Sequence, residues 1–128
     1  MLVALIHWRI KPDAENVRAF LEFWRTKATV ENPAGLVGEF LSEPGSLKDF
    51  PYITWHLDPE SLGDHKPFVN VAFWADEQAF RSQIAPKFND DLPMLPFEKY
   101  RRRRVVLQPD SWRIGAARLP MSSSEGVV

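Results

Sequence analysis

The chain contains no cysteine among its 128 residues. This absence excludes disulfide bonds, thiolate metal sites and a cysteine nucleophile, and it fits the reducing cytoplasm in which we expect the protein to reside. No sign of charge dominates either, since 17 Asp and Glu face 16 Lys and Arg. A formal charge of −1 gives no general attraction to nucleic acid or to an anionic membrane, so neither is expected as a partner.

Long apolar runs and signature loops are also missing. The apolar start of the chain is only about six residues long, too short for a membrane span, and it lacks the basic leader of a signal peptide. The sequence has no glycine-rich nucleotide loop and no Gly-x-Ser-x-Gly elbow. Its three histidines lack the close spacing of a metal site. We therefore expect no cofactor and no metal.

Aromatic residues, by contrast, are abundant, with five Trp and nine Phe. Such side chains line either a core or an apolar pocket, and composition alone does not distinguish the two. The length fits one domain. We place it at residues 1–116, with an irregular insert at about 44–66, and expect residues 117–128 to form a flexible tail.

Alternating apolar residues predict four strands. The first is the clearest, because residues 2–10 are rich in β-branched and aromatic types and end at a Lys-Pro pair. The other three are expected over residues 36–42, 67–74 and 99–108, with Trp112, Arg113 and Ile114 as candidates to extend the last one. The insert at 44–66 is expected to hold a further short strand or hairpin.

Two helices are expected between the strands. From Asp13 to about Val30, one apolar stripe repeats at helical spacing: Val17, Phe20, Leu21, Trp24 and Ala28. A shorter helix starts at Asp76, and we expect Pro86 to stop it. Its inward face is expected to comprise Ala79, Phe80, Gln83 and Ile84.

This order of elements predicts an α+β, ferredoxin-like split βαβ fold. Its antiparallel sheet has the first and third strands at the centre and both helices on one face. The other face then carries large apolar side chains: Val3, Leu5, Phe40 or Leu41, Trp74, and Val105 or Val106. Because exposed apolar patches usually mark an interface, we expect a homodimer in which two sheets close into a barrel.

Three segments carry a resemblance to a known family: LVALIHWRIKPD, GLVGEFLSEP and FVNVAFWADEQAFRSQI. Together they resemble the antibiotic-biosynthesis-monooxygenase family of dimeric α/β barrels, over roughly residues 1–108. The resemblance implies a cofactor-independent monooxygenase that acts on a flat aromatic or polyketide-like substrate. The haem-degrading branch of the family uses a Trp in the second helix and a His after it; this chain has Gln83 at that place and no His after His65.

The family's cofactor-free anthrone oxygenases carry an Asn and a Trp four residues apart on the third strand, and Asn70 and Trp74 match this spacing. The resemblance implies that Asn70 stabilises a developing oxyanion and that Trp74 stacks on the substrate ring. Both side chains share one strand face. Since the alternate residues Val69, Val71 and Phe73 suit the helices, we expect Asn70 and Trp74 to face the barrel interior.

His7, on the neighbouring first strand, is the candidate base, because it titrates near neutral pH and is expected inward with Val3 and Leu5. A plain structural hydrogen bond is the other possibility for it. Substrate contacts are expected from Trp8, Phe40, Trp55, Arg102 and Arg104. Only alternate members of Arg101 to Arg104 share a face, so salt bridges at a sheet edge are the competing role for them.

Two other functions stay open at this point. One is a non-catalytic dimeric binding or stress-associated protein that holds a small hydrophobic ligand in the barrel. The other is an isomerase or lyase, which uses a base on the same fold without oxygen.

Overall fold

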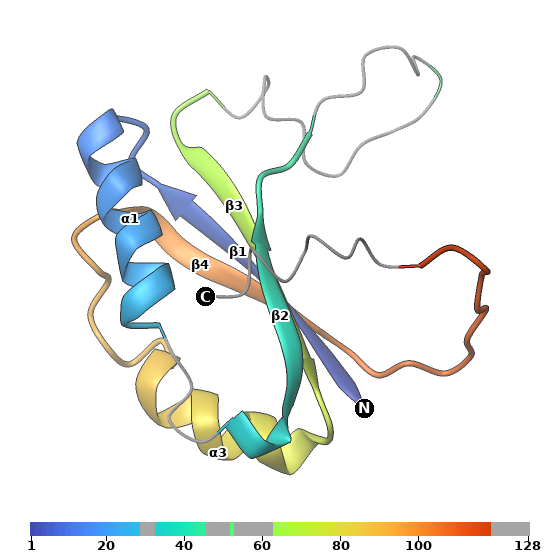
Figure 1. Ribbon diagram of the computed structural model, residues 1–128. Helices are drawn as coiled ribbons and strands as arrows, with labels where there is room; N and C mark the ends of the chain where they lie inside the picture. The colour runs from blue at the N-terminus through green and yellow to red at the C-terminus, as the bar shows by residue number, and fades with distance from the viewer. Residues whose placement is uncertain (29–32, 46–51, 53–62, 119–128) are drawn as a thin grey trace.

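The computed structural model describes residues 1–28, 33–45, 52 and 63–118. In chain order the elements are β1 (Leu2–Ile10), α1 (Ala14–Thr26), the 3-10 turn η1 (Pro33–Gly35), β2 (Leu36–Ser42), β3 (Lys66–Trp74), α3 (Glu77–Phe88) and β4 (Glu98–Leu107), as Figure 1 shows. The four predicted strands and both helices are confirmed. Most of the predicted insert lies outside the described residues.

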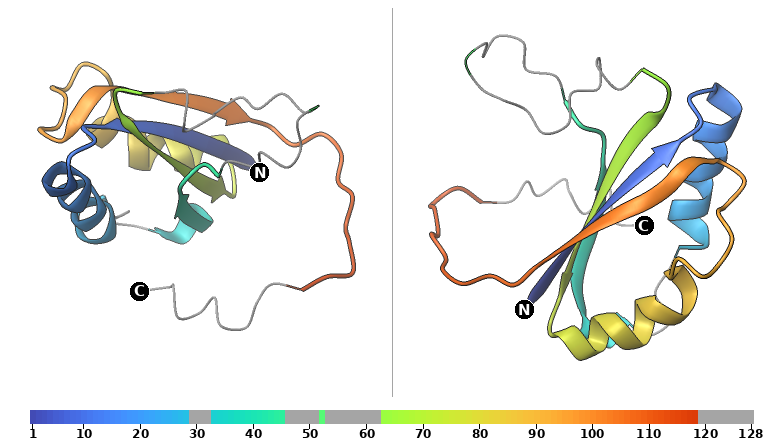
Figure 2. Two further views of the ribbon diagram at one scale, coloured as in Figure 1. Left: turned by 90° about the horizontal axis from the view of Figure 1, so that it is seen from above. Right: turned by 180° about the vertical axis from the view of Figure 1, so that it is seen from behind.

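The four strands form one antiparallel sheet in the order β2-β3-β1-β4, so the first and third strands are central, as predicted. Both helices lie on the same side of the sheet (Figure 2). The chain therefore has the α+β, ferredoxin-like arrangement that the order of its elements predicts. Neither described helix has the length and apolar character needed to cross a membrane.

The pairing register decides which side chains face the helices. Ile6 of β1 lies opposite Asn70 of β3 and opposite Arg104 of β4. Directly opposed residues of antiparallel strands point to the same face. Even-numbered residues of β1 and β3 thus face the helices, and odd-numbered ones face away. The predicted orientation of β3, with Val69, Val71 and Phe73 toward the helices, is wrong.

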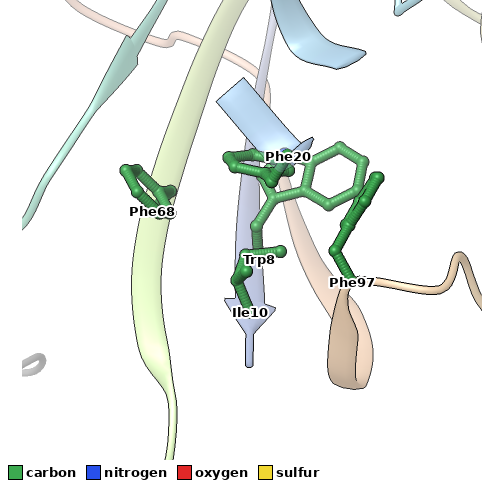
Figure 3. Close-up of a cluster of buried hydrophobic side chains, with 5 residues drawn as sticks. All are labelled: Trp8, Ile10, Phe20, Phe68 and Phe97. Carbon is green, nitrogen blue, oxygen red and sulfur yellow. The ribbon is translucent and has the colours of Figure 1, made fainter. Parts of the chain in front are cut away.

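Aromatic packing between α1 and the sheet explains that orientation. Phe20 of α1 is fully buried and lies 5.0 Å, centroid to centroid, from the rings of both Trp8 and Phe68. Ile10 and Phe97 complete this cluster (Figure 3). The even-numbered face of β1 carries the larger apolar side chains, and the hydrophobic gain of covering them places it under the helix.

A second cluster fills the space between α3 and the other end of the sheet. Leu2, Ala4, Ala72 and Trp74 are buried there, and Ala79, Phe80 and Ile84 of α3 pack against them. Trp74 therefore belongs to the helix-covered face. The prediction that placed it with Val3 and Leu5 on the uncovered face is wrong.

Side-chain caps define where the two helices begin. Asp13 accepts a hydrogen bond from the Asn16 backbone N–H at 3.1 Å, and Asp76 accepts one from the Ala79 N–H at 2.8 Å. Each satisfies a donor that a helix start leaves open. Helix α1 ends at Thr26, earlier than predicted, with Lys27 as its C-cap.

The C-terminal ends of α3 and β4 differ from the predictions. Helix α3 continues through Pro86 to Phe88, because a proline in the last turn removes only one N–H, and the Asn89 side chain donates to the Ala85 carbonyl at 2.8 Å. Trp112 and Ile114 do not extend β4; they lie outside any strand and are exposed. No strand in the described part of the chain pairs with them.

Gly35 marks a close approach between η1 and α3. A Cβ atom at this position would lie 2.3 Å from the Cβ of Ala79, well inside van der Waals contact. The Gly35 carbonyl also accepts a hydrogen bond from the Ala75 N–H at 2.8 Å, which fixes the turn against the start of α3. The absence of a side chain at residue 35 is therefore a packing requirement.

We predict that Gly35→Ala lowers the free energy of unfolding by about 1–3 kcal/mol, the usual cost of overpacking. Gly38→Ala is the matched control, because a Cβ atom at residue 38 would have no other atom within 4 Å. Urea denaturation of both variants measures the difference. Equal stability of the two would contradict the close approach of η1 to α3.

Candidate functional site

A pocket lies between the sheet and both helices and opens to solvent at its mouth. Its cavity volume is about 40 Å³, room for a few water molecules and smaller than the usual range for small-molecule sites. All four strands and both helices contribute to its wall, which consists of Ile6, Trp8, Trp24, Ala28, Glu39, Asn70, Ala72, Trp74, Phe80, Ile84, Phe88, Arg102 and Arg104. Aromatic side chains thus dominate a wall that has a few polar groups.

Five of the residues singled out from the sequence meet in this pocket: Asn70, Trp74, Trp8, Arg102 and Arg104. They come from three adjacent strands, β3, β1 and β4, and the sheet register brings them to one face. Their meeting place is the space between sheet and helices within one chain, not the uncovered face that a barrel would enclose.

His7 and Phe40 do not join them. His7 lies opposite Val69 and Arg103, and this register puts it on the face away from Asn70. Phe40 lies opposite Val71 and is half exposed on the same far face. Trp55 lies outside the described residues. The prediction that His7 shares a face with Asn70 is wrong, because β1 and β3 pair with Ile6 opposite Asn70.

Asn70 is a buried amide in a largely apolar wall, with 6% of its surface exposed. Its Nδ2 donates a hydrogen bond to Oε2 of Glu39 on the neighbouring strand β2, at 3.2 Å. Loss of water around the carboxyl raises the pKa of Glu39 above its ordinary value, while the bond from Asn70 opposes the rise. The pocket thus holds an amide and a carboxylate in direct contact.

Glu39 is the site residue that the sequence analysis missed. It sits two positions before Leu41, so strand alternation places both on one face. An acid within the apolar segment LVGEFLS was the available signal. Only the pairing of β2 with β3, which sets Leu41 opposite Asn70, shows that this acid lies beside the amide.

The two arginines in the wall already have anionic partners. Arg102 binds the fully buried Glu98 through two nitrogens, at 2.5 and 3.2 Å, and its guanidinium lies 4.6 Å from the Trp8 ring centroid. Arg104 binds Asp90 at 3.0 Å and also donates to the Phe88 carbonyl. The Arg104 pair fastens β4 to the segment after α3, whereas the Arg102 pair lies within β4. Of the two acidic partners, only Asp90 is solvent-exposed.

Two pocket residues, Trp8 and Trp74, have indole N–H groups without an acceptor among the described residues. The Nε1 atoms of Trp8 and Trp74 are buried, and neither has a hydrogen-bond partner within the described part of the chain. Buried donors without partners are uncommon and costly in proteins. An oxygen-bearing ligand in the pocket is one source of the missing acceptors.

A separate polar cluster surrounds His7 on the far face. The His7 and His65 rings lie 6.0 Å apart, and His65 Nδ1 lies 2.9 Å from a carboxylate oxygen of Asp64. Tyr100 donates to the same carboxylate, and the Arg9 guanidinium lies 4.9 Å from the Tyr100 ring centroid. No group of three or more metal-ligating side chains occurs among residues 1–28, 33–45, 52 and 63–118.

The sequence matches no protein-family model and no curated protein. Among solved structures, it is similar to a monooxygenase from the ActVA-Orf6 gene of Streptomyces coelicolor in complex with Nanaomycin D, with a TM-score of 0.58 and 16% identity. That match covers 90% of this chain and 92% of the other. A MhuD variant with two manganese protoporphyrin IX molecules bound per active site matches with a TM-score of 0.50, 19% identity, and coverage of 88% and 99%.

These likenesses extend over nearly the whole of each chain. They show that the protein shares the fold of these two structures, which confirms the α+β, ferredoxin-like fold expected from the sequence. At such identities the likeness concerns the fold, and the chemistry has to be argued from the pocket itself.

We predict that Arg102→Met lowers the free energy of unfolding at pH 7 by about 3–5 kcal/mol, because it leaves the Glu98 carboxylate buried without a cation. The double variant Glu98→Gln/Arg102→Met is expected to recover most of this loss. Its glutamine still accepts the Leu95 N–H that Glu98 accepts at 2.9 Å. Urea unfolding measures both variants, and a loss below about 1 kcal/mol for the single variant would mean that the pair behaves as a surface one.

Proposed function

We propose that this chain is a cofactor-independent monooxygenase that acts on a flat aromatic or polyketide-like substrate in the pocket between the sheet and its helices. The observation that carries the proposal is the buried Asn70 amide, which faces a wall of aromatic side chains. Trp8 and Trp74 add buried N–H donors that lack acceptors in the described part of the chain. A planar substrate with carbonyl or phenol oxygens complements both features.

The similar structures support a small-molecule substrate. The Streptomyces coelicolor monooxygenase holds Nanaomycin D, and the MhuD variant holds manganese protoporphyrin IX, so the same fold accommodates ligands of this general size. In this chain, three Trp and two Phe line the pocket between the sheet and its helices.

The proposed reaction needs no cofactor, because the substrate itself supplies the electrons. A methylene group between two aromatic rings loses a proton, and the carbanion transfers an electron to molecular oxygen. Recombination forms a C–O bond and, after protonation, a hydroperoxide, which loses water to leave a ketone. The overall change is CH2 + O2 → C=O + H2O, with one oxygen atom entering the substrate.

Asn70 would act on the charge that this reaction creates. When the proton leaves, negative charge moves onto the ring carbonyl oxygen, and a fixed amide N–H stabilises it more than it stabilises the neutral ground state. One N–H of the Asn70 amide bonds to Glu39, and the second, which has no partner among the described residues, would bind the substrate oxygen. Trp74, on the same face, belongs to the wall of the pocket.

We predict that Asn70→Ala lowers oxygen consumption with anthrone by about 100-fold or more, the typical effect of removing one oxyanion donor. His7→Gln is the control, because it alters the neighbouring strand on the opposite face, and its rate is expected to stay within about threefold of the parent rate. An oxygen electrode measures both against the protein-free background. Uptake in Asn70→Ala equal to that of the parent would reject the role of Asn70, and tight binding without uptake would favour a ligand-binding protein.

We also propose that the uncovered sheet face pairs with a second copy of this chain. Val3, Leu5, Val105 and Leu107 share that face, and Val105 and Leu107 are about half exposed in the single chain. A two-fold axis would set this apolar surface against itself and remove it from water.

We predict that Val105→Asp converts the protein from dimer to monomer, because it puts an unpaired charge at the centre of the proposed interface. Val106→Asp is the matched control. It changes a similarly exposed neighbour that points to the opposite face of β4. Sedimentation velocity gives the mass of each, and a dimer that survives Val105→Asp, or a parent protein that is monomeric, would contradict the pairing.

A further inference from the structure

We propose that Glu39 is the general base of the pocket, and that it takes the acidic C–H proton of a substrate that enters uncharged. The proposal rests on the proposed function only for the class of substrate, a C–H acid on an aromatic ring system. It replaces His7, which faces away from the pocket, by a residue of the edge strand β2.

Position is the first argument. Glu39 lies opposite Ala72, and its neighbour on the same face, Leu41, lies opposite Asn70. The Asn70 bond to Oε2 of Glu39 holds that oxygen 3.2 Å from the amide nitrogen. A carbonyl held by the second N–H of Asn70 would thus lie near the carboxylate, which keeps its other oxygen, Oε1, available for a proton.

The composition of the wall is the second argument. Among the described residues that line the pocket, Glu39 is the only one with a side chain that accepts a proton near neutral pH. The other ionisable members, Arg102 and Arg104, are cations bound to Glu98 and Asp90. No ion pair among the described residues involves Glu39, so no described cation holds its carboxylate in the basic form.

The environment of the Glu39 carboxyl suits a general base. Although much of Glu39 is exposed on the edge strand, partial loss of water around its carboxyl raises its pKa toward the pH at which a base works. The Asn70 bond lowers that pKa and so keeps part of the population ionised. An anionic substrate would meet this carboxylate without a free cation among the described wall residues, which favours a neutral one.

The step balances without oxygen. The substrate C–H bond breaks, its electron pair stays on carbon and spreads into the ring carbonyl, and an O–H bond forms on Glu39. Return of a proton from Glu39 to the same carbon restores the substrate. In D2O without oxygen, this reversal replaces the methylene hydrogens of the substrate by deuterium. The rate of this exchange reports the activity of the base independently of any oxidation.

The experiment is anaerobic deuterium exchange into anthrone, followed by loss of its methylene proton NMR signal. We expect the parent protein to exchange faster than the buffer and Glu39→Gln to lose about 100-fold of that excess rate. Glu43→Gln is the control; this carboxylate lies four positions further along the chain, next to Lys66 at 3.5 Å and outside the pocket wall. Thermal melting establishes that each variant is folded.

A pH profile separates a base from a merely structural group. The exchange rate should rise with pH through the pKa of Glu39, since the carboxylate is the active form. Asn70→Ala removes the bond that lowers this pKa, so its rising limb should move to higher pH. A structural role for Glu39 would leave the limb in place.

The outcomes distinguish this proposal from the oxygenase proposal. Exchange that depends on Glu39, without oxygen uptake, would keep the base and reject the oxygenase in favour of an isomerase or lyase. Oxygen uptake with exchange unchanged in Glu39→Gln would overturn the base and keep the oxygenase. A parent protein that exchanges no faster than buffer at saturating anthrone would also overturn the base.

Discussion

The pairing of β1 with β3, Ile6 opposite Asn70, is the constraint on which the site depends. A shift of one residue between these two strands would put Asn70 and His7 on the same face of the sheet. Aromatic packing prevents that shift, because Trp8 and Phe68 must both meet Phe20 of α1. The hydrophobic core therefore fixes the orientation of the polar groups.

Of the charged side chains in the pocket wall, the two arginines are paired with carboxylates, and Glu39 is the acid that can still exchange a proton. Arg102 and Arg104 are each held by a carboxylate from the segment near the end of α3 and the start of β4, Glu98 and Asp90. Glu39, on the opposite edge strand, has only the neutral amide of Asn70 as its described partner. A paired cation near an aromatic ring mainly gives rigidity, whereas a carboxylate with a raised pKa remains able to move a proton. The chemistry thus concentrates at the β2 side of the pocket.

The two faces of the sheet have different roles because the helices cover only one of them. The covered face encloses the pocket and both hydrophobic clusters. The uncovered face combines an apolar region around Val105 with the polar group of His7, His65 and Tyr100. Residues only one position apart on β1 or β4 therefore belong to different environments, which is why His7 and Ile6 differ in their access to the pocket.

The sequence by itself determined the strands, the helices and their order, because these follow from local periodicity and caps such as Asp13 and Asp76. It also determined that Asn70 and Trp74 share a face, since side chains alternate along a strand. Tertiary structure alone decided which face turns to the helices, and so excluded His7 from the pocket and brought Glu39 to Asn70. The physical reason is that alternation relates residues within one strand, whereas the phase between strands depends on long-range pairing and on the packing of the whole core.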